Sequence, residues 1–258
     1  MSQTPVPSSW PSDVKTLSID VGGSGLKGSV LDAEGQMLTE RVRIETPYPC
    51  TPEVLVKNLL ELGQATGSSF DRVSVGFPGL VRDGKVVYVT AFVRREYGGE
   101  PDAELTLAWD GYDLATALAD GFGVPVKVAN DADMQGCAVA QGDGFEFVMT
   151  LGTGCGTAVF NNGKLLPHME LSHAPFQKGE TFDQQLGNAA RDEIGNKKWR
   201  KRVRKAIPAF ERFLFFDHIY VGGGNAKHTK PEDLGPKATV VPNTAGILGG
   251  IRIWDLDA

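Results

Sequence analysis

The sequence has few cysteines and no long apolar run. Its three cysteines, Cys50, Cys137 and Cys155, lie far apart and form no Cys-x-x-Cys pair. This spacing excludes a disulfide framework and a four-ligand zinc site, and it favours a reducing cytoplasm. Nowhere do about 18 apolar residues follow one another, and residues 1–11 have neither a basic start nor an apolar run, so we expect neither a membrane span nor secretion.

A surplus of positive charge is also lacking. The chain has 26 Lys and Arg residues against 32 Asp and Glu residues, which gives a net charge of −6. This balance argues against a general binder of polyanions such as nucleic acid.

A local exception is the basic run at residues 197–205, in which seven of nine residues are Lys or Arg. On a helix, Trp199, Val203, Ile207 and Phe210 would form one apolar stripe, and the cations would cover the remaining surface. A solvated helix face is one interpretation. In a chain that is otherwise acidic, the other is a track for linear polyphosphate. The predicted track consists of Lys197, Lys198, Arg200, Lys201 and Arg204.

Glycine, by contrast, is abundant, with 32 of the 258 residues against about 7% in average proteins. Two glycine turns, at residues 22–25 and 152–154, each separate two short apolar strands, and the sequences around them match with one gap. A repeated unit of this kind predicts an α/β protein of two lobes.

Hydrophobic spacing predicts the elements that carry these turns. Helices are expected at residues 52–65, 112–121, 131–141, 182–193, 196–215 and 244–254. Strands are expected at residues 14–19, 26–31, 36–44, 73–77, 124–129, 147–151, 156–160, 164–166, 218–221 and 239–241. The first lobe should span residues 14–128 with a C-terminal helix of about 244–258, the second residues 129–243, and residues 1–12 should form a loose tail.

The glycine turns are candidate phosphate sites, because they expose backbone N–H groups with no side chain in the way. Their duplication, and a third glycine cluster at residues 222–224, favour this interpretation over simple tight turns. The turns match neither the P-loop nor the dinucleotide-binding spacing. Asp20 ends the strand before the first turn, where it could hold a hydrated Mg²⁺ over the phosphates or only stabilise the turn.

Two further groups of polar residues could bind a sugar. Asn130 and Asp131 follow a predicted strand, where a carboxylate could accept the proton of a sugar hydroxyl, although Asp131 or Asp133 could instead cap the next helix. Glu170 and His173, in the segment Glu-Leu-Ser-His, could form hydrogen bonds with neighbouring sugar hydroxyls or could be surface residues only.

Seven motifs in a fixed order carry a resemblance to a known family. They are Asp-Val-Gly-Gly-Ser-Gly-Leu-Lys-Gly from Asp20, Val-Gly-Phe-Pro-Gly from Val75, Val-Ala-Asn-Asp-Ala-Asp from Val128, Thr-Leu-Gly-Thr-Gly-Cys-Gly-Thr from Thr150, Leu-Pro-His-Met-Glu-Leu-Ser-His from Leu166, Tyr-Val-Gly-Gly-Gly-Asn-Ala-Lys from Tyr220 and Asn-Thr-Ala-Gly-Ile-Leu-Gly-Gly from Asn243. With these motifs the sequence resembles the ROK sugar kinases of the hexokinase and actin-like superfamily, and within them the polyphosphate glucokinases.

The resemblance implies an α/β fold of two ribonuclease-H-like lobes with a cleft between them. It also implies phosphoryl transfer from inorganic polyphosphate, ATP or both to the 6-hydroxyl of glucose. Asp131 would be the general base, and the sugar would be bound by Gly79, Asn130, Glu170, His173 and Asp183. The donor phosphates would be bound by Asp20, Gly22, Gly23, Ser24, Gly25, Lys27, Gly152, Thr153, Gly154, Gly223, Gly224 and Asn225.

The resemblance also sets expectations for cofactors and partners. Mg²⁺ is expected, held by Asp20 through water. Zinc is not expected, because the cysteines that accompany the histidine in many ROK proteins are absent near His173, and Ser172 stands where glycine is usual. A homodimer is expected, and DNA binding is not, because twelve residues before the first strand leave no room for a winged helix. The alternatives are an ATP-only hexose or amino-sugar kinase and a catalytically silent sugar-binding protein.

Overall fold

The structure is a computed structural model that describes residues 10–242 and 245–255. Contacts within the chain divide it into two units, residues 1–134 with 246–255 and residues 135–245 with 256–258. The first unit thus extends past residue 128, where the sequence suggested a boundary, and includes Asn130 and Asp131. Most of the expected N-terminal tail, the start of the expected last helix at Thr244, and residues 256–258 lie outside the described residues.

The first unit is built on a five-stranded mixed sheet with the strand order β3-β2-β1-β4-β7. Its strands are β1 (Thr16–Gly22), β2 (Gly25–Leu31), β3 (Val42–Ile44), β4 (Arg72–Phe77) and β7 (Val126–Asn130). The first three pair antiparallel, whereas β4 and β7 run parallel to β1. Asp20 is in register with Gly76, and Gly76 with Ala129, so Asp20 and Asn130 lie at the same edge of the sheet.

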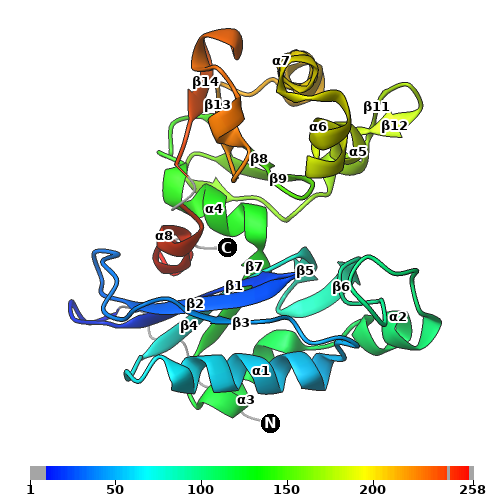
Figure 1. The fold of residues 1–258 in the computed structure, drawn as a ribbon. Coiled ribbons are helices and arrows are strands. Elements are labelled where there is room, and N and C mark those ends of the chain that lie inside the picture. The colour runs from blue at the N-terminus through cyan, green and yellow to red at the C-terminus, as the bar shows by residue number, and fades with distance from the viewer. Residues whose placement is uncertain (1–9, 243–244, 256–258) are drawn as a thin grey trace. The chain divides into compact units, whose positions relative to one another are not determined.

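Helices cover both faces of this sheet. The helices α1 (Pro52–Ala65) and α3 (Leu114–Phe122) lie on one face and α8 (Ala245–Arg252) on the other (Figure 1). Leu17 and Ile19 of β1 join the apolar core with α1, whereas Ser18 lies against Gly250 of α8. Because a Cβ at position 250 would collide with Ser18, the small residues on this face allow α8 to approach closely.

Aromatic and basic side chains anchor the chain after α8. The indole Nε1 of Trp254 donates to Ser74 Oγ at 2.7 Å. The Arg72 guanidinium lies over the rings of both Trp10 and Trp254, 4.9 and 5.3 Å from their centroids. Burial lowers the pKa of Arg72, and the two cation–π contacts offset part of the cost of burying the charge.

The second unit repeats the strand arrangement of the first, with the order β10-β9-β8-β13-β14. Its strands are β8 (Phe145–Leu151), β9 (Cys155–Asn161), β10 (Lys164–Leu165), β13 (His218–Gly222) and β14 (Ala238–Val240). Again three strands pair antiparallel and two run parallel to the first of them. The expected repeat is therefore confirmed in the topology as well as in the sequence.

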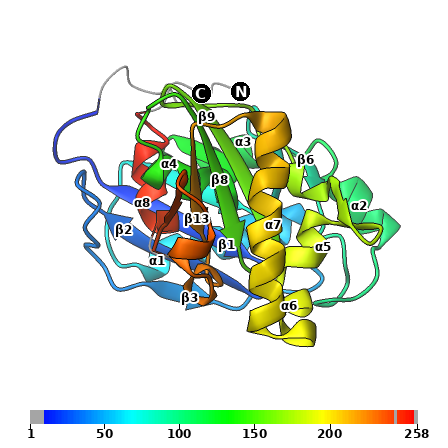
Figure 2. The same cartoon turned by 90° about the horizontal axis from the view of Figure 1, so that it is seen from above.

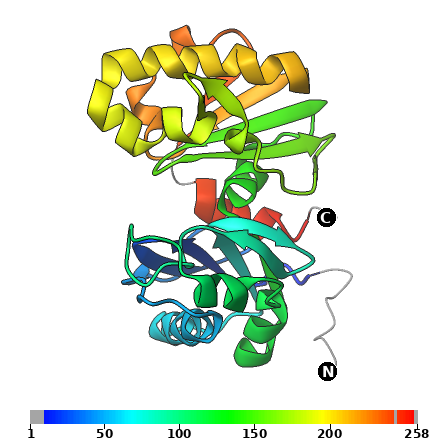
Figure 3. The same cartoon turned by 90° about the vertical axis from the view of Figure 1, so that its right-hand side faces the viewer.

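The basic run lies on α7 (Asn196–Leu214), which packs along the second sheet (Figures 2 and 3). Trp199, Val203, Ile207 and Phe210 are all buried, so the expected apolar stripe is confirmed. On the other face of the sheet, Gly136 of α4 (Asp131–Val139) lies against the Phe160 ring. Within residues 10–242 and 245–255, no helix is both long and apolar enough to cross a membrane.

Several elements differ from the expectations. The strand expected at residues 36–44 is confined to β3, and the helix expected at 182–193 is two helices, α5 (Phe182–Leu186) and α6 (Asn188–Ile194). They separate at Gly187, where a Cβ would lie only 2.5 Å from the carbonyl oxygen of Thr153. The remaining elements are β5 (Gly79–Arg82), β6 (Lys85–Val89), α2 (Ala103–Trp109), β11 (Pro175–Gln177), β12 (Glu180–Thr181) and the 3-10 turns Leu171–His173, Ala226–His228 and Pro231–Asp233.

Candidate functional site

Two carbonyl groups of the first glycine turn accept hydrogen bonds from side-chain hydroxyls. The hydroxyl of Thr46 donates to the carbonyl of Gly22 at 2.6 Å, and that of Tyr48 to the carbonyl of Gly23 at 2.7 Å. Because the C=O and N–H of a trans peptide point in opposite directions, the N–H groups of Gly23 and Ser24 point away from these hydroxyls. The turn therefore presents donors, rather than carbonyl oxygens, to a ligand on its other side.

Charged side chains lie beside this turn. Lys27 Nζ of β2 is 3.1 Å from Asp20 Oδ2 of β1, and the two residues are cross-strand partners. Both side chains are partly exposed, Lys27 by 37% and Asp20 by 48%. The ion pair leaves Asp20 accessible to a hydrated cation and partly neutralises Lys27.

The carbonyl groups of the second glycine turn also accept hydrogen bonds, here from residues of α6 and of the loop after β13. The N–H of Asn188 donates to the carbonyl oxygens of Gly152 and Thr153, each at 3.1 Å. The side-chain amide of Asn225 also donates to Gly152, at 3.0 Å. By the same peptide geometry, the N–H groups of Thr153 and Gly154 point away from these partners. Two turns of related sequence thus both present backbone donors, as an oxyanion site requires.

The third glycine cluster supports the second turn. Gly223 has a φ of 84°, and a Cβ there would collide with Leu151 at the end of β8. The N–H of Asn225 donates to the Leu151 carbonyl at 2.8 Å. Gly224, in contrast, has open space where its Cβ would be. Gly223 is therefore a packing residue, and Gly224 leaves one side of the loop uncovered.

Asn130 and Asp131 lie at the junction of β7 and α4. Asn130 is buried, and its amide donates to the Gly79 carbonyl at 3.0 Å. The N–H of Ala132 donates to Asn130 Oδ1 at 2.7 Å and to Asp131 Oδ1 at 2.8 Å. The Asn130 side chain thus caps α4, although the sequence offered only Asp131 or Asp133 for capping. The Asp131 carboxylate accepts the same N–H, so it also stabilises the first turn of α4. In addition, Asn130 fixes Gly79 and the start of α4 relative to each other.

Glu170 lies between two histidines, one of which the sequence reasoning had assigned no role. Glu170 Oε1 is 3.6 Å from His168 Nε2, and Oε2 is 3.8 Å from His173 Nε2. Burial by itself would raise the pKa of Glu170, but the interactions with His168 and His173 outweigh it and hold the pKa below its usual range. His168 is almost fully buried, whereas His173 is half exposed. The predicted pair of Glu170 and His173 therefore belongs to a group of three side chains. The third is His168, whose imidazole is buried, whereas that of His173 is accessible.

Asp183, which was predicted to bind the sugar, lies against the second glycine turn. Its Oδ1 accepts the N–H of Cys155 at 2.7 Å, and a Cβ at Gly154 would collide with the same carboxylate. Glycine at position 154 therefore makes room for Asp183. The carboxylate supports the turn, and its sugar role stays a prediction.

The predicted polyphosphate track lies on the exposed surface of α7. Lys197, Lys198, Lys201 and Arg204 are exposed, and Arg200 is partly buried. The Arg204 guanidinium lies 3.8 Å from Asp233 Oδ1. The charges thus face solvent on the side of α7 opposite its buried stripe.

Two cations near Asn225, Arg191 and Lys227, were not recognised in the sequence. Arg191 of α6 donates to the Asn225 side-chain oxygen. Burial and the nearby charges of Arg191, Lys227 and Arg200 lower the pKa of His228. Because these cations come from α6, α7 and the loop after β13, only the fold brings them together. Arg191 and Lys227 thus extend the positive charge of α7, which includes Arg200, toward the second glycine turn.

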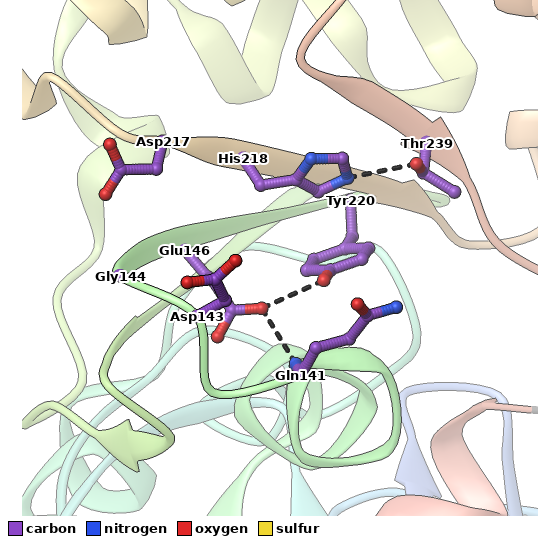
Figure 4. Close-up of a pocket in the computed structure, with 8 residues that line it drawn as sticks. All are labelled: Gln141, Asp143, Gly144, Glu146, Asp217, His218, Tyr220 and Thr239. Carbon is purple, nitrogen blue, oxygen red and sulfur yellow. Dashed lines mark hydrogen bonds between the residues drawn. The ribbon is translucent and has the colours of Figure 1, made fainter.

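A polar cavity of about 700 Å³ lies elsewhere in the second unit, at the start of β8 and β13 (Figure 4). The Glu146 carboxylate accepts the N–H groups of Gln141 and Gly142 and the hydroxyl of Tyr220. Burial, together with the bond to Glu146, raises the pKa of Tyr220. No predicted site residue lines this cavity, and its buried carboxylate already has three donors, so we do not include it in the candidate site.

No group of three or more His, Cys, Asp and Glu side chains among the described residues is arranged to hold a metal ion. A single half-exposed carboxylate, such as Asp20, still fits Mg²⁺, because this ion keeps several waters and takes its other ligands from substrate phosphates.

Comparisons with known proteins agree with these features. The profile of the ROK family matches residues 16–174. A polyphosphate glucokinase of Mycobacterium tuberculosis (strain CDC 1551 / Oshkosh) is 32% identical over 250 residues, 90% of this chain and 88% of the relative. An N-acetylmannosamine kinase of Escherichia coli (strain SE11) is 32% identical over 155 residues, 58% of this chain and 49% of the relative.

A solved structure extends the likeness to the fold. The inorganic polyphosphate/ATP-glucomannokinase of Arthrobacter sp. strain KM has a TM-score of 0.78 and 29% identity, and the match covers 95% of this chain and 100% of that one. The α/β fold class predicted from the motifs is confirmed.

Proposed function

Because the chain belongs to the ROK family, we propose that it is a sugar kinase that transfers a phosphoryl group from inorganic polyphosphate or ATP to the 6-hydroxyl of glucose. The observation that carries this proposal is the pair of glycine turns, each with its carbonyls bound to protein donors and its N–H groups directed away from them. Phosphoryl transfer requires such donors, because catalysis depends mainly on positioning and on neutralising phosphate charge.

Asp131 is the general base of this proposal. As the sugar oxygen attacks the donor phosphorus, Asp131 takes the hydroxyl proton while the bond from phosphorus to the rest of the donor breaks. The bonds of Asn130 to Gly79 and Ala132 support this role, because they fix the backbone that carries Asp131. The proposed ligands of the other hydroxyls are those that the family resemblance implies: Gly79, Asn130, Glu170 and His173.

Mg²⁺ would be held by Asp20 through water, and it would neutralise charge on the donor phosphates. Lys27 and the N–H groups of Gly23 and Ser24 are proposed to bind these phosphates in the first unit. In the second unit, the proposed phosphate ligands are Gly152, Thr153, Gly154, Gly224 and Asn225.

Polyphosphate as a donor is supported by two arguments. Two of the proteins to which this chain is similar over most of its length bear names that include polyphosphate. The exposed basic face of α7, extended by Arg191 and Lys227, carries more positive charges than the few phosphates of ATP could contact at once. A long chain of phosphates would release counterions at each contact.

An ATP-only amino-sugar kinase is the second candidate, favoured by the 155-residue similarity to an N-acetylmannosamine kinase. Formation of sugar 6-phosphate should be measured with polyphosphate and ATP as separate donors and with glucose and N-acetylmannosamine as separate acceptors. Glucose phosphorylation with polyphosphate supports the first candidate. Phosphorylation of N-acetylmannosamine with ATP and none with polyphosphate favours the second, and no activity with any pair would indicate a silent sugar-binding protein. The expected homodimer stays a prediction.

A further inference from the structure

Three charged residues form a row across the first three strands of the first unit. Asp20 of β1 is the cross-strand partner of Lys27 of β2, and Lys27 is the partner of Arg43 of β3. Directly paired residues in a sheet have side chains on the same face, so all three charges lie on one face. This row lies next to the first glycine turn, because β2 begins at Gly25, two residues before Lys27.

Arg43 extends diagonally across β2 to the glycine turn. The position that a Cβ of Gly25 would occupy is 3.0 Å from Arg43 Nε and 3.4 Å from Nη2. Diagonal neighbours of this kind are within reach of a long side chain. A side chain at position 25 would take the space of the guanidinium, so Gly25 allows Arg43 to lie over the turn.

The charge of Arg43 is not matched by a neighbouring acid. Arg43 is exposed, and no hydrogen bond or ion pair joins its side chain to any of the residues that the structure describes. Lys27 differs, because its ammonium is paired with Asp20 at 3.1 Å. Among the described residues, the first glycine turn therefore has an unpaired guanidinium beside Gly25.

We propose that Arg43 is a phosphate-binding residue that holds the phosphoryl donor at the first glycine turn. This inference rests on the proposed kinase function and adds a residue to its donor site. A guanidinium offers several N–H donors in a planar fork, which binds two oxygens of one phosphate, and it remains charged at all physiological pH values. Polyphosphate and ATP share this phosphate chemistry, so Arg43 serves both donors.

The test measures equilibrium binding of inorganic tripolyphosphate, and separately of ATP, to the full chain without sugar. Arg43→Gln should weaken tripolyphosphate binding by about tenfold or more, because it removes a charge-assisted contact. Arg43→Lys should restore part of the affinity. The matched control is Arg41→Gln, which removes the same charge from an exposed residue two positions earlier. It should change binding by less than about twofold, as expected for a solvent-screened charge.

The outcomes separate this inference from the proposed function. If Arg43→Gln binds tripolyphosphate as the wild type does, or if Arg41→Gln loses as much, the inference is overturned. It is also overturned if the wild type binds neither tripolyphosphate nor ATP. If binding depends on Arg43 but the wild type phosphorylates no sugar with either donor, the inference stands and the proposed function fails. Equal losses with both ligands indicate a shared phosphate contact, whereas a loss with ATP alone would contradict binding of polyphosphate by Arg43. Thermal unfolding of each variant establishes that the fold is retained.

Discussion

The carboxylate of Asp183 accepts the backbone N–H of Cys155 at 2.7 Å, although the two residues are 28 positions apart in the sequence. This bond joins the start of α5 to the second glycine turn. Cys155 is the first residue of β9, so the bond fixes the point at which the chain leaves the turn. The conformation of a proposed phosphate site thus depends on a side chain from a distant helix.

The first prediction follows from this bond. Asp183→Ala should raise the KM for both phosphate donors several-fold, because the turn loses a charge-assisted hydrogen bond of about 1.5–3 kcal/mol. The KM for glucose should change much less. Steady-state kinetics with each substrate varied in turn checks this. A rise in the KM for glucose alone would instead favour the predicted sugar role of Asp183, and Asp143→Ala, at an exposed position away from the turn, is the control.

The second prediction concerns the general base. Asp131→Asn keeps the size of the side chain but removes the proton acceptor, so kcat should fall by roughly 10²–10⁴. The variant should still fold, because an asparagine oxygen can also accept the N–H of Ala132. Glucose 6-phosphate formation and the melting temperature should both be measured. A folded variant with near-normal turnover would exclude Asp131 as the base.

The third prediction concerns the basic face of α7. Replacement of Arg200, Lys201 and Arg204 with Gln should raise the KM for long polyphosphate and reduce its dependence on salt, with little change for ATP. The fold should persist, because the one ion pair that these residues make within the described part of the chain, Arg204 with Asp233, is exposed.

The control for this prediction removes three charges elsewhere in the second unit. Lys164, Lys178 and Lys230 are all exposed, and their replacement with Gln matches the change in net charge. Equal losses with polyphosphate and ATP in the α7 variant, or equal effects in the two triple variants, would reject α7 as a polyphosphate track.

The fourth prediction is a pH dependence that originates at Glu170. Its pKa is lowered in the folded chain, so its contribution to stability is present above the unfolded value of about 4.5. That contribution is lost as the pH falls through the lowered folded value, because only the unfolded chain takes up the proton in between. The stability difference between wild type and Glu170→Gln should therefore shrink as the pH falls below about 4.5.

Urea denaturation at a series of pH values measures this difference. The matched control is Glu180→Gln, an exposed carboxylate with no ion pair among the described residues. Its difference from the wild type should stay nearly constant over the same range. A constant difference for Glu170→Gln as well would contradict the stabilising interaction with His168 and His173.

The fifth prediction concerns the cofactor. Removal of Mg²⁺ with EDTA should abolish phosphoryl transfer, since the donor phosphates then keep their full negative charge. Asp20→Asn should raise the Mg²⁺ concentration needed for half-maximal rate, because a neutral amide binds a hydrated cation more weakly than a carboxylate. Full activity in EDTA would refute the magnesium assignment. Stoichiometric zinc in the purified protein would refute the expectation that zinc is absent.

The repeated unit, the two glycine turns and the amphipathic character of α7 can all be predicted from the order of the residues. These features depend on local spacing: apolar residues recur with the period of a strand or helix, and glycine stands where a turn needs it. The motif from Val128 also located the end of β7 and the start of α4, because an Asx residue at a strand end commonly caps the next helix.

The way in which distant side chains combine at these turns follows from packing in the folded chain. Arg43 lies over Gly25 because of the register between β2 and β3, and a shift of one residue would turn it to the other face. The division at Gly187 likewise depends on contact with Thr153. Asp183 reaches Cys155 because α5 packs beside the second turn. Such contacts arise from packing between segments far apart in the chain, and local periodicity carries no information about them.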